Sequence, residues 1–123
     1  KCCTNEDSCE GLVRGSVIVL ETKDQFDAML SRAGAEDKLA LVKFTATWCG
    51  PCQAIKEDIK KLAAKETEVY VAEVDVDEND ETAADCGIAA MPTFQWYRNG
   101  KKIRELRGAN VGEVKHWTKH FNK

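Results

Sequence analysis

Two cysteines separated by two residues, Cys49 and Cys52 in the stretch TWCGPCQ, are the side chains best placed to do chemistry. Residues three apart on a helix have Cα atoms roughly 5 Å apart, and a disulfide permits about 4.4 to 6.8 Å. A bridge between them can therefore form and open without moving the backbone. Three uses of such a pair compete: a structural crosslink, part of a metal site, or reversible thiol–disulfide exchange.

The crosslink and the metal site fit the sequence less well than exchange does. Closing so small a loop removes little chain entropy, so a bridge there adds little stability. A zinc site needs four ligands, usually as two such pairs. His116 and His120 are four residues apart but lie at the far end of the chain. We therefore expect no metal and favour thiol–disulfide exchange.

The position of the pair predicts different roles for the two sulfurs. A buried strand is expected to end just before the cysteines and a helix to begin with them, and helix N-termini stabilise a thiolate. An ordinary thiol with a pKa of about 8.5 is only about 3% thiolate at pH 7, so any fall in the pKa multiplies the attacking species. Cys52 falls in line with the apolar face of that helix, whereas Cys49 precedes it and can face solvent. We expect Cys49 to attack and Cys52 to resolve.

The sequence around the cysteines alternates short apolar runs with segments of helical periodicity. Thr22 and Gln25 form a capping-box pattern that opens a helix, and Gly34 marks its expected end. Apolar residues at helical spacing predict a second helix that follows the cysteines and runs to about Glu66. Such alternation implies parallel strands joined by right-handed crossovers. The expected strands span 17–20, 39–45 and 69–76, and a short helix spans 79–86.

The C-terminal part of the chain predicts a hairpin and a last helix. Asn99-Gly100 is the strongest short-range hairpin signal, because both central residues of a type I′ turn need positive φ. Its flanks, 93–98 and 101–106, are therefore two antiparallel strands. The predicted fold is α/β, a central mixed five-stranded sheet with helices on both faces. An apolar stripe is expected to dock the last helix on the sheet: Val111, Val114, Trp117 and Phe121.

Length and composition limit the classes of protein that fit. A chain of 123 residues suits one domain, and we divide it into an N-terminal tail (1–15) and a folded domain (16–123). A net charge of −3 with interspersed signs offers no basic field for nucleic acid. No apolar run approaches the roughly 18 residues that a membrane helix needs. Three cysteines crowd the tail, where they are inert, paired with each other or paired with the central cysteines: Cys2, Cys3 and Cys9.

A set of short motifs resembles the thioredoxin family, in that family's order, from about Ser16 to the C-terminus. The motifs are Trp48-Cys49-Gly50-Pro51-Cys52, Val74-Asp75-Val76-Asp77, Met91-Pro92-Thr93-Phe94, Asn99-Gly100 and Gly108-Ala109-Asn110. The resemblance implies a thioredoxin fold and a protein disulfide reductase. The Cys49 thiolate would attack a substrate disulfide, and Cys52 would release the reduced substrate by closing the bridge. No nucleotide-binding motif is present, so we expect no bound cofactor.

The same resemblance implies a substrate-binding surface around the cysteines. Trp48 would shield the disulfide, and Pro92 would be cis, next to it. Cis X-Pro bonds make up only about 5 to 6% of such bonds in folded proteins, so the sequence alone predicts trans. A cis bond would leave the Met91 backbone free to pair with an extended substrate. Pro51 pre-sets the helical φ, and Gly50 lets another backbone approach closely.

Partners and location follow from the resemblance, with two rival interpretations. We expect disulfide-containing protein substrates, an NADPH-dependent thioredoxin reductase as electron donor, a monomer and a cytoplasmic location. The tail cysteines instead allow a disulfide oxidase or isomerase of a secretory compartment, although Gly50-Pro51 accompanies reducing members of the superfamily. A third hypothesis is a catalytically weakened binding adaptor.

One departure from the family pattern bears on mechanism. Thioredoxins usually place a buried acid beneath the resolving cysteine, where this chain has Lys43. A charged lysine cannot take a proton from Cys52. The position facing it on the next strand is Glu73, so we expect a reversed pair in which Glu73, directly or through water, accepts that proton. The alternative is that Lys43 snorkels out to solvent and the site runs more slowly.

Two other residues carry expectations of their own. Glu57 stands where the family often has a proline that bends the active-site helix, so we expect a straighter helix. Cys86 is expected to pack as a small hydrophobic residue, with regulatory oxidation as the alternative.

Overall fold

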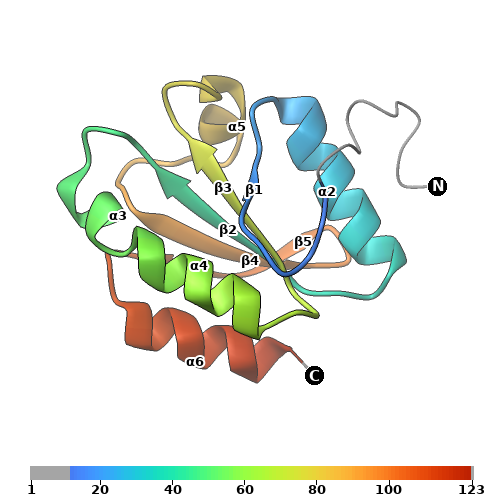
Figure 1. The fold of residues 1–123 in the computed structure, drawn as a ribbon. Helices are drawn as coiled ribbons and strands as arrows, with labels where there is room; N and C mark the ends of the chain where they lie inside the picture. The colour runs from blue at the N-terminus through green and yellow to red at the C-terminus, as the bar shows by residue number, and fades with distance from the viewer. Residues whose placement is uncertain (1–11, 123) are drawn as a thin grey trace.

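A mixed five-stranded sheet forms the centre of the computed structural model, which describes residues 12–122 (Figure 1). The strands are β1 (Ile18–Val19), β2 (Ala40–Thr45), β3 (Tyr70–Asp75), β4 (Thr93–Arg98) and β5 (Lys101–Arg107). The strand order is β1-β3-β2-β4-β5. Strands β1, β3 and β2 run parallel to one another. Strand β4 runs antiparallel to β2, and β5 runs antiparallel to β4. The predicted mixed sheet is confirmed.

Helices cover both faces of this sheet, as predicted. Alternate residues of β2 point to opposite faces, so Val42 packs with α2 and Leu41 packs with α4 and α6. Figure 1 shows α2 and α5 together on one face and α4 and α6 together on the other. The helices are α2 (Lys23–Ala35), α3 (Gly50–Ala54), α4 (Lys56–Lys65), α5 (Asp80–Asp85) and α6 (Val111–Phe121).

The start of α2 confirms the capping prediction in a modified form. Thr22 is the N-cap, and its Oγ1 accepts a hydrogen bond from the backbone N–H of Gln25 at 3.1 Å. The Gln25 side chain accepts from the backbone N–H of Glu21 at 2.6 Å, one residue earlier than in the usual capping box. The first bond satisfies a donor that the helix itself leaves unpaired, and the second fixes the chain just before the N-cap.

The end of α2 differs from the prediction. The helix continues past Gly34 to Ala35, and Asp37 adopts the positive φ of 55° that turns the chain. Gly34 lies next to the hairpin turn: a Cβ at this residue would be 3.5 Å from the Cα of Asn99. The chain turns at Asp37 and not at Gly34, so the prediction that Gly34 ends the helix is wrong.

The hairpin and the last helix form as predicted. Asn99 and Gly100 have φ values of 53° and 76°, which are the two positive angles of the type I′ turn. The apolar stripe of α6 packs on the sheet, with Val114 fully buried. The indole N–H of Trp96 on β4 donates to Thr118 Oγ1 of α6 at 3.0 Å, which ties the helix to the sheet.

Packing begins before the predicted domain boundary at Ser16. Leu12 is only 5% exposed and belongs to the core beneath α2. Arg14 forms an ion pair with Glu68 at 3.3 Å and lies over the ring of Tyr70. The tail cysteines lie outside the described residues, so the predictions for them stay predictions.

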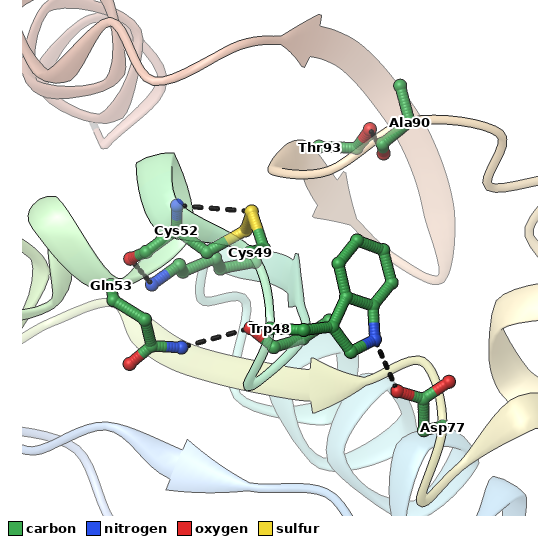
Figure 2. Close-up of a disulfide and its surroundings, with 9 residues drawn as sticks. Trp48, Cys49, Cys52, Gln53, Asp77, Ala90 and Thr93 are labelled. Carbon is green, nitrogen blue, oxygen red and sulfur yellow. Dashed lines mark hydrogen bonds between the residues drawn. A yellow bond between two sulfur atoms is a disulfide. The ribbon is translucent and has the colours of Figure 1, made fainter.

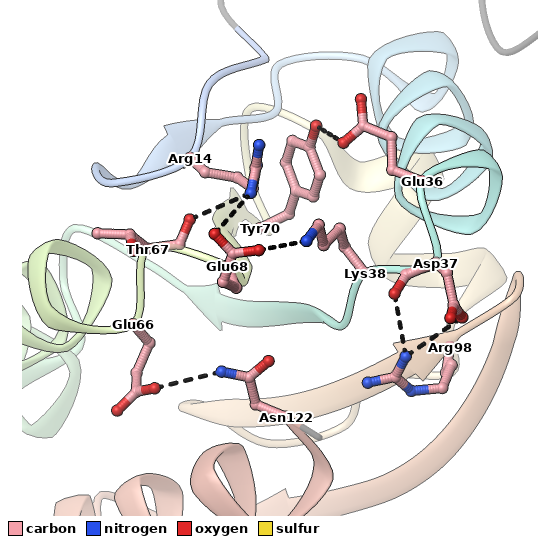
Figure 3. Close-up of polar contacts among 10 residues, drawn as sticks. All are labelled: Arg14, Glu36, Asp37, Lys38, Glu66, Thr67, Glu68, Tyr70, Arg98 and Asn122. Carbon is pink, nitrogen blue, oxygen red and sulfur yellow. Dashed lines mark hydrogen bonds and ion pairs between the residues drawn. The ribbon is translucent and has the colours of Figure 1, made fainter.

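Polar contacts close the end of the sheet that lies away from the cysteines (Figure 3). Glu68, just before β3, pairs with both Arg14 and Lys38. The Tyr70 hydroxyl donates to Glu36 Oε1 at 2.5 Å, and this bond is the main cause of a lowered pKa for the Glu36 carboxyl. These contacts hold the N-terminal ends of β2 and β3 together. The cysteines lie at the opposite end, after β2.

No helix within residues 12–122 is long and apolar enough to cross a membrane.

Candidate active site

Cys49 and Cys52 lie where β2 has ended and α3 begins, and they are joined as a disulfide (Figure 2). Their Cα atoms are 5.3 Å apart, inside the range expected from the spacing. Cys49 is the N-cap of α3, and its Sγ accepts a hydrogen bond from the backbone N–H of Cys52 at 3.2 Å. The same N–H is positioned to stabilise a thiolate on Cys49 once the bridge is reduced.

The two sulfurs differ in access, by less than the sequence suggested. Cys52 is fully buried, whereas Cys49 keeps 6% of its surface exposed. The prediction that Cys49 is the more accessible residue is confirmed. The prediction that it faces solvent is too strong, because Ala46 and Met91 pack around the pair. Cys49 is therefore open to solvent only through a small opening.

Trp48 lies beside the disulfide and is tied to a distant part of the chain. Its side chain is 66% exposed, and its indole N–H donates to Asp77 Oδ2 at 2.8 Å (Figure 2). Asp77 follows the end of β3, which lies next to β2 in the sheet. Asp77 belongs to one of the sequence motifs, but its contact with Trp48 was not predicted. The sequence signal that could have indicated this contact is the position of Asp77 just after the carboxyl end of β3, the strand next to β2.

The Met91–Pro92 peptide bond is cis, as the family resemblance implied. Met91 packs against the cluster that contains both cysteines. Neither the N–H nor the carbonyl of Met91 forms a hydrogen bond within residues 12–122. Thr93 Oγ1 donates to the carbonyl of Ala90 at 2.6 Å and braces this turn from the other side (Figure 2). The turn therefore presents free backbone groups beside the disulfide.

The active-site helix is broken, although no proline bends it. The segment divides into α3 and α4 at Ile55, whose φ and ψ of −102° and 3° are not helical. Cys52 is buried in the cluster around the disulfide, while Ile55 and Ile59 are buried between α4 and the sheet. The break lets both groups pack. The prediction of a straighter helix, based on Glu57, is wrong.

Lys43 is buried directly beneath Cys52. Its side chain is only 2% exposed, and its ammonium donates to the backbone carbonyl of Cys52 at 3.0 Å. Burial lowers the pKa of this ammonium from its ordinary 10.5, the Glu73 carboxylate opposes the shift, and Lys56 adds to it. The alternative in which Lys43 snorkels to solvent is therefore wrong.

Glu73 occupies the position opposite Lys43 on the neighbouring strand. The two residues are register partners of β2 and β3, as expected for a reversed pair. Within residues 12–122 they form no ion pair, because the Lys43 ammonium is directed to Cys52 instead. Glu73 is half-buried.

A cavity of about 70 Å³ connects Glu73 and Lys43 to the underside of the active-site loop. It is large enough to hold water. Thr45 Oγ1 is buried in this region with no partner in the described part of the chain, so a polar group is left for such water to bind. The lining residues are Lys43, Thr45, Ala46, Thr47, Gln53, Lys56, Glu73 and Asp75.

The remaining candidate residues lie away from the disulfide. Cys86 is half-buried and has no disulfide partner among residues 12–122, and its Sγ lies 3.7 Å from the Tyr97 hydroxyl. Burial raises the pKa of the Cys86 thiol, which favours packing over reactivity. Among residues 12–122 no three His, Cys, Asp or Glu side chains are grouped to hold a metal ion.

Comparisons with known proteins agree on one family. The family model for thioredoxin matches residues 17–120. Mouse thioredoxin (Mus musculus) is 48% identical over 94 residues, which cover 76% of this chain and 88% of the mouse protein. Human thioredoxin (Homo sapiens) is 45% identical over 91 residues, which cover 74% of this chain and 85% of the human protein.

Solved structures of thioredoxins share the fold. A thioredoxin from Nicotiana alata superposes with a TM-score of 0.84 at 31% identity, covering 89% of this chain and 96% of the other. A Schistosoma mansoni thioredoxin gives a TM-score of 0.81 at 35% identity, covering 89% and 98%.

Proposed function

Since the chain belongs to the thioredoxin family and is a dithiol disulfide reductase, we propose that Cys49 is its attacking sulfur and Cys52 its resolving sulfur. The single observation that carries this assignment is the difference in exposure between the two cysteines at the start of α3. Cys49 keeps an exposed edge and a backbone N–H donor, while Cys52 is fully buried. The Cys49 thiolate attacks one sulfur of a substrate disulfide, and the other substrate sulfur leaves as a thiolate. Cys52 then attacks Cys49, closes the bridge and releases the second substrate thiol, so two electrons pass to the substrate.

The surface around the opening supports recognition of an extended substrate segment. The free N–H and carbonyl of Met91 would pair with substrate backbone, and Pro92 in the cis form holds them beside the disulfide. Gly50 and Pro51 are exposed and have no bulky side chain, so a substrate backbone can pass close to Cys49. The exposed ring of Trp48 borders the opening to Cys49 on another side. Main-chain pairing gives little side-chain selectivity, which suits a range of protein substrates.

Glu73 is the proton acceptor for Cys52 in this proposal. The Cys52 thiol must lose its proton before it attacks the mixed disulfide. Glu73 is the partner of Lys43 across the β2–β3 pair, and both line the cavity beneath the active-site loop. Water in this cavity would carry the proton from Cys52 to Glu73. In the disulfide form the Lys43 ammonium donates to the Cys52 carbonyl and is not available as the acceptor. The acid that the family places at position 43 is thereby replaced from the neighbouring strand.

The electron donor and location are extensions of the family assignment. Thioredoxins work on disulfide substrates and are recycled by a thioredoxin reductase, and we expect the same of this chain. A cytoplasmic location and a monomeric state complete the proposal. A secretory oxidase or isomerase is the competing assignment, and a reduction potential measured against glutathione discriminates between the two.

Insulin reduction with dithiothreitol tests the proposal. The unmodified chain is expected to accelerate insulin precipitation, and both Cys49→Ser and Cys52→Ser are expected to abolish turnover. Cys86→Ser is the matched control, because it removes a sulfur that lies outside the site. The Cys52→Ser variant should also retain substrate as a mixed disulfide on Cys49. Absence of turnover by the unmodified chain would contradict the proposal and favour a binding adaptor.

A further inference from the structure

The buried ammonium of Lys43 has an electrostatic consequence that goes beyond proton transfer. Its side chain is 2% exposed, and its one acceptor in the described part of the chain is the carbonyl of Cys52 at 3.0 Å. A single peptide carbonyl accepts one of the three N–H bonds of an ammonium and does not cancel its charge. A positive charge in such a place is costly unless something nearby compensates it.

The charged groups around Lys43 leave this charge only partly compensated. Glu73 faces it from β3, and Asp75 lines the same cavity at the end of that strand. Lys56 faces it from α4 and has the same sign. Within residues 12–122 no carboxylate oxygen lies within ion-pair distance of the Lys43 ammonium. The residue whose carbonyl the ammonium does contact, Cys52, carries a sulfur that can become charged when the bridge is reduced.

Reduction of the bridge creates negative charge at that location. The disulfide is neutral, whereas the dithiol can ionise at either sulfur. The Lys43 ammonium donates to the backbone carbonyl of Cys52, so its positive charge lies next to the residue that carries the sulfur. A cation at this distance in a poorly solvated region stabilises a thiolate strongly. It offers no comparable stabilisation to the neutral disulfide.

We propose that Lys43 is a redox-tuning residue, whose buried ammonium stabilises the Cys52 thiolate and thereby shifts the protein toward its dithiol form. The chain is then a weaker reductant than it would be with a neutral residue at position 43. This inference rests on the Cys49 and Cys52 exchange proposed above and specifies what sets its equilibrium. Glu73 takes the Cys52 proton, and Lys43 stabilises the anion that remains.

The equilibrium with glutathione measures this effect. Two glutathione thiols give two electrons to the protein, the Cys49–Cys52 bond breaks, and a bond between the two glutathione sulfurs forms. The two thiol protons pass to the protein sulfurs, or to solvent where a protein sulfur remains ionised. Whatever stabilises a protein thiolate therefore moves this equilibrium toward the dithiol.

The experiment compares the parent, Lys43→Met and Lys101→Met in glutathione buffers at several pH values from about 7 to 10, because thiolate stabilisation affects the equilibrium only where the sulfur is ionised. Lys43→Met keeps the length of the side chain and removes its charge. Lys101→Met removes the same charge from the exposed tip of the hairpin. At the higher pH values, where the Cys52 sulfur of the dithiol is ionised in both proteins, we expect Lys43→Met to shift the equilibrium toward the disulfide by about tenfold, the change that one pKa unit represents, equivalent to 29.6 mV for two electrons. We expect Lys101→Met to shift it by less than about twofold, since an exposed and distant charge is screened.

Two further measurements separate an electrostatic role from a structural one. Titration of thiolate absorbance should show a cysteine pKa about one unit higher in Lys43→Met, and Lys43→Arg, which keeps the charge, should return it toward the parent value. In the unmodified protein, the Lys43 pKa measured by NMR should be higher in the reduced than in the oxidised form, because the coupling between two charges is reciprocal.

An equilibrium within about twofold of the parent for Lys43→Met at every pH in this range, or a Lys43 pKa that does not change on reduction, would overturn the inference. These readouts need no protein substrate. If the parent fails to reduce insulin but Lys43→Met shifts the glutathione equilibrium, the proposed function fails and this inference stands.

Discussion

Trp48 and Asp77 are 29 positions apart in the sequence and are joined by a hydrogen bond of 2.8 Å between indole and carboxylate. The bond connects the loop that carries Cys49 with the end of β3. It holds a largely exposed aromatic ring in one orientation at the rim of the opening to the disulfide. An exposed ring without such a bond would sample other rotamers.

Loss of the Asp77 carboxylate should therefore weaken substrate handling without unfolding the protein. We expect Asp77→Ala to lower kcat/KM for insulin reduction by about two- to fivefold, the equivalent of one modest hydrogen bond. Asp80→Ala, an exposed acid at the start of α5, is the control and should have no effect. An unchanged kcat/KM for Asp77→Ala would show that the ring needs no such support.

Glu73 is expected to control the pH dependence of the resolving step. Glu73→Gln keeps the shape of the side chain but cannot accept a proton, so resolution of the mixed disulfide should slow by about tenfold or more at neutral pH. The rate should recover as rising pH ionises Cys52 without help. Stopped-flow measurement of mixed-disulfide decay across pH 6 to 9 gives the profile. Glu78→Gln, an exposed acid near the same strand end, is the control. A rate and profile identical to the parent would rule out Glu73 as the acceptor.

The lowered pKa of Lys43 predicts how stability depends on pH. Between the folded pKa and the ordinary value of 10.5, the unfolded chain binds a proton at Lys43 that the folded chain does not. The stability contributed by this group is therefore present above 10.5 and is lost as the pH falls through the folded pKa. Lys43→Met lacks this dependence. The free energy of unfolding of the variant minus that of the parent should decrease as the pH rises toward 10.5.

Urea unfolding of the oxidised proteins at several pH values tests this sign, because the exposed lysines contribute equally to both and cancel. A difference that stays constant or grows with pH would mean that Lys43 is not destabilised by burial in the folded state.

The bond between Trp96 and Thr118 should matter for stability and not for chemistry. Thr118 is fully buried, and its hydroxyl accepts the indole N–H while donating to the Val114 carbonyl at 2.7 Å. Thr118→Val keeps the shape but leaves the buried indole unpaired. We expect a loss of about 1 to 3 kcal/mol in the free energy of unfolding. Insulin reduction should be unchanged where the variant is folded, and Thr67→Val at an exposed site should cost little. Equal stability of Thr118→Val and the parent would contradict this role.

The elements of the fold were predictable because their signals are local. The capping pattern at Thr22 and the Asn99-Gly100 turn depend on a few neighbouring residues, and both are confirmed. The end of α2 and the break at Ile55 were not predicted. The turn after α2 is made at Asp37, whose carbonyl accepts a hydrogen bond from Arg98 of β4, and the break at Ile55 lets the chain bury two different clusters. Both are contacts between segments that are far apart in sequence.

The amino-acid order by itself determined the spacing of Cys49 and Cys52, their place at the mouth of a helix, and the alternation that builds a mixed sheet. These follow from backbone geometry and periodicity, which act over a few residues. Only the tertiary structure decided that Cys49 is mostly covered, that Lys43 turns inward to the Cys52 carbonyl, and that Asp77 holds Trp48. Burial and charge compensation depend on which distant strands and loops are brought together, and no local pattern contains that information.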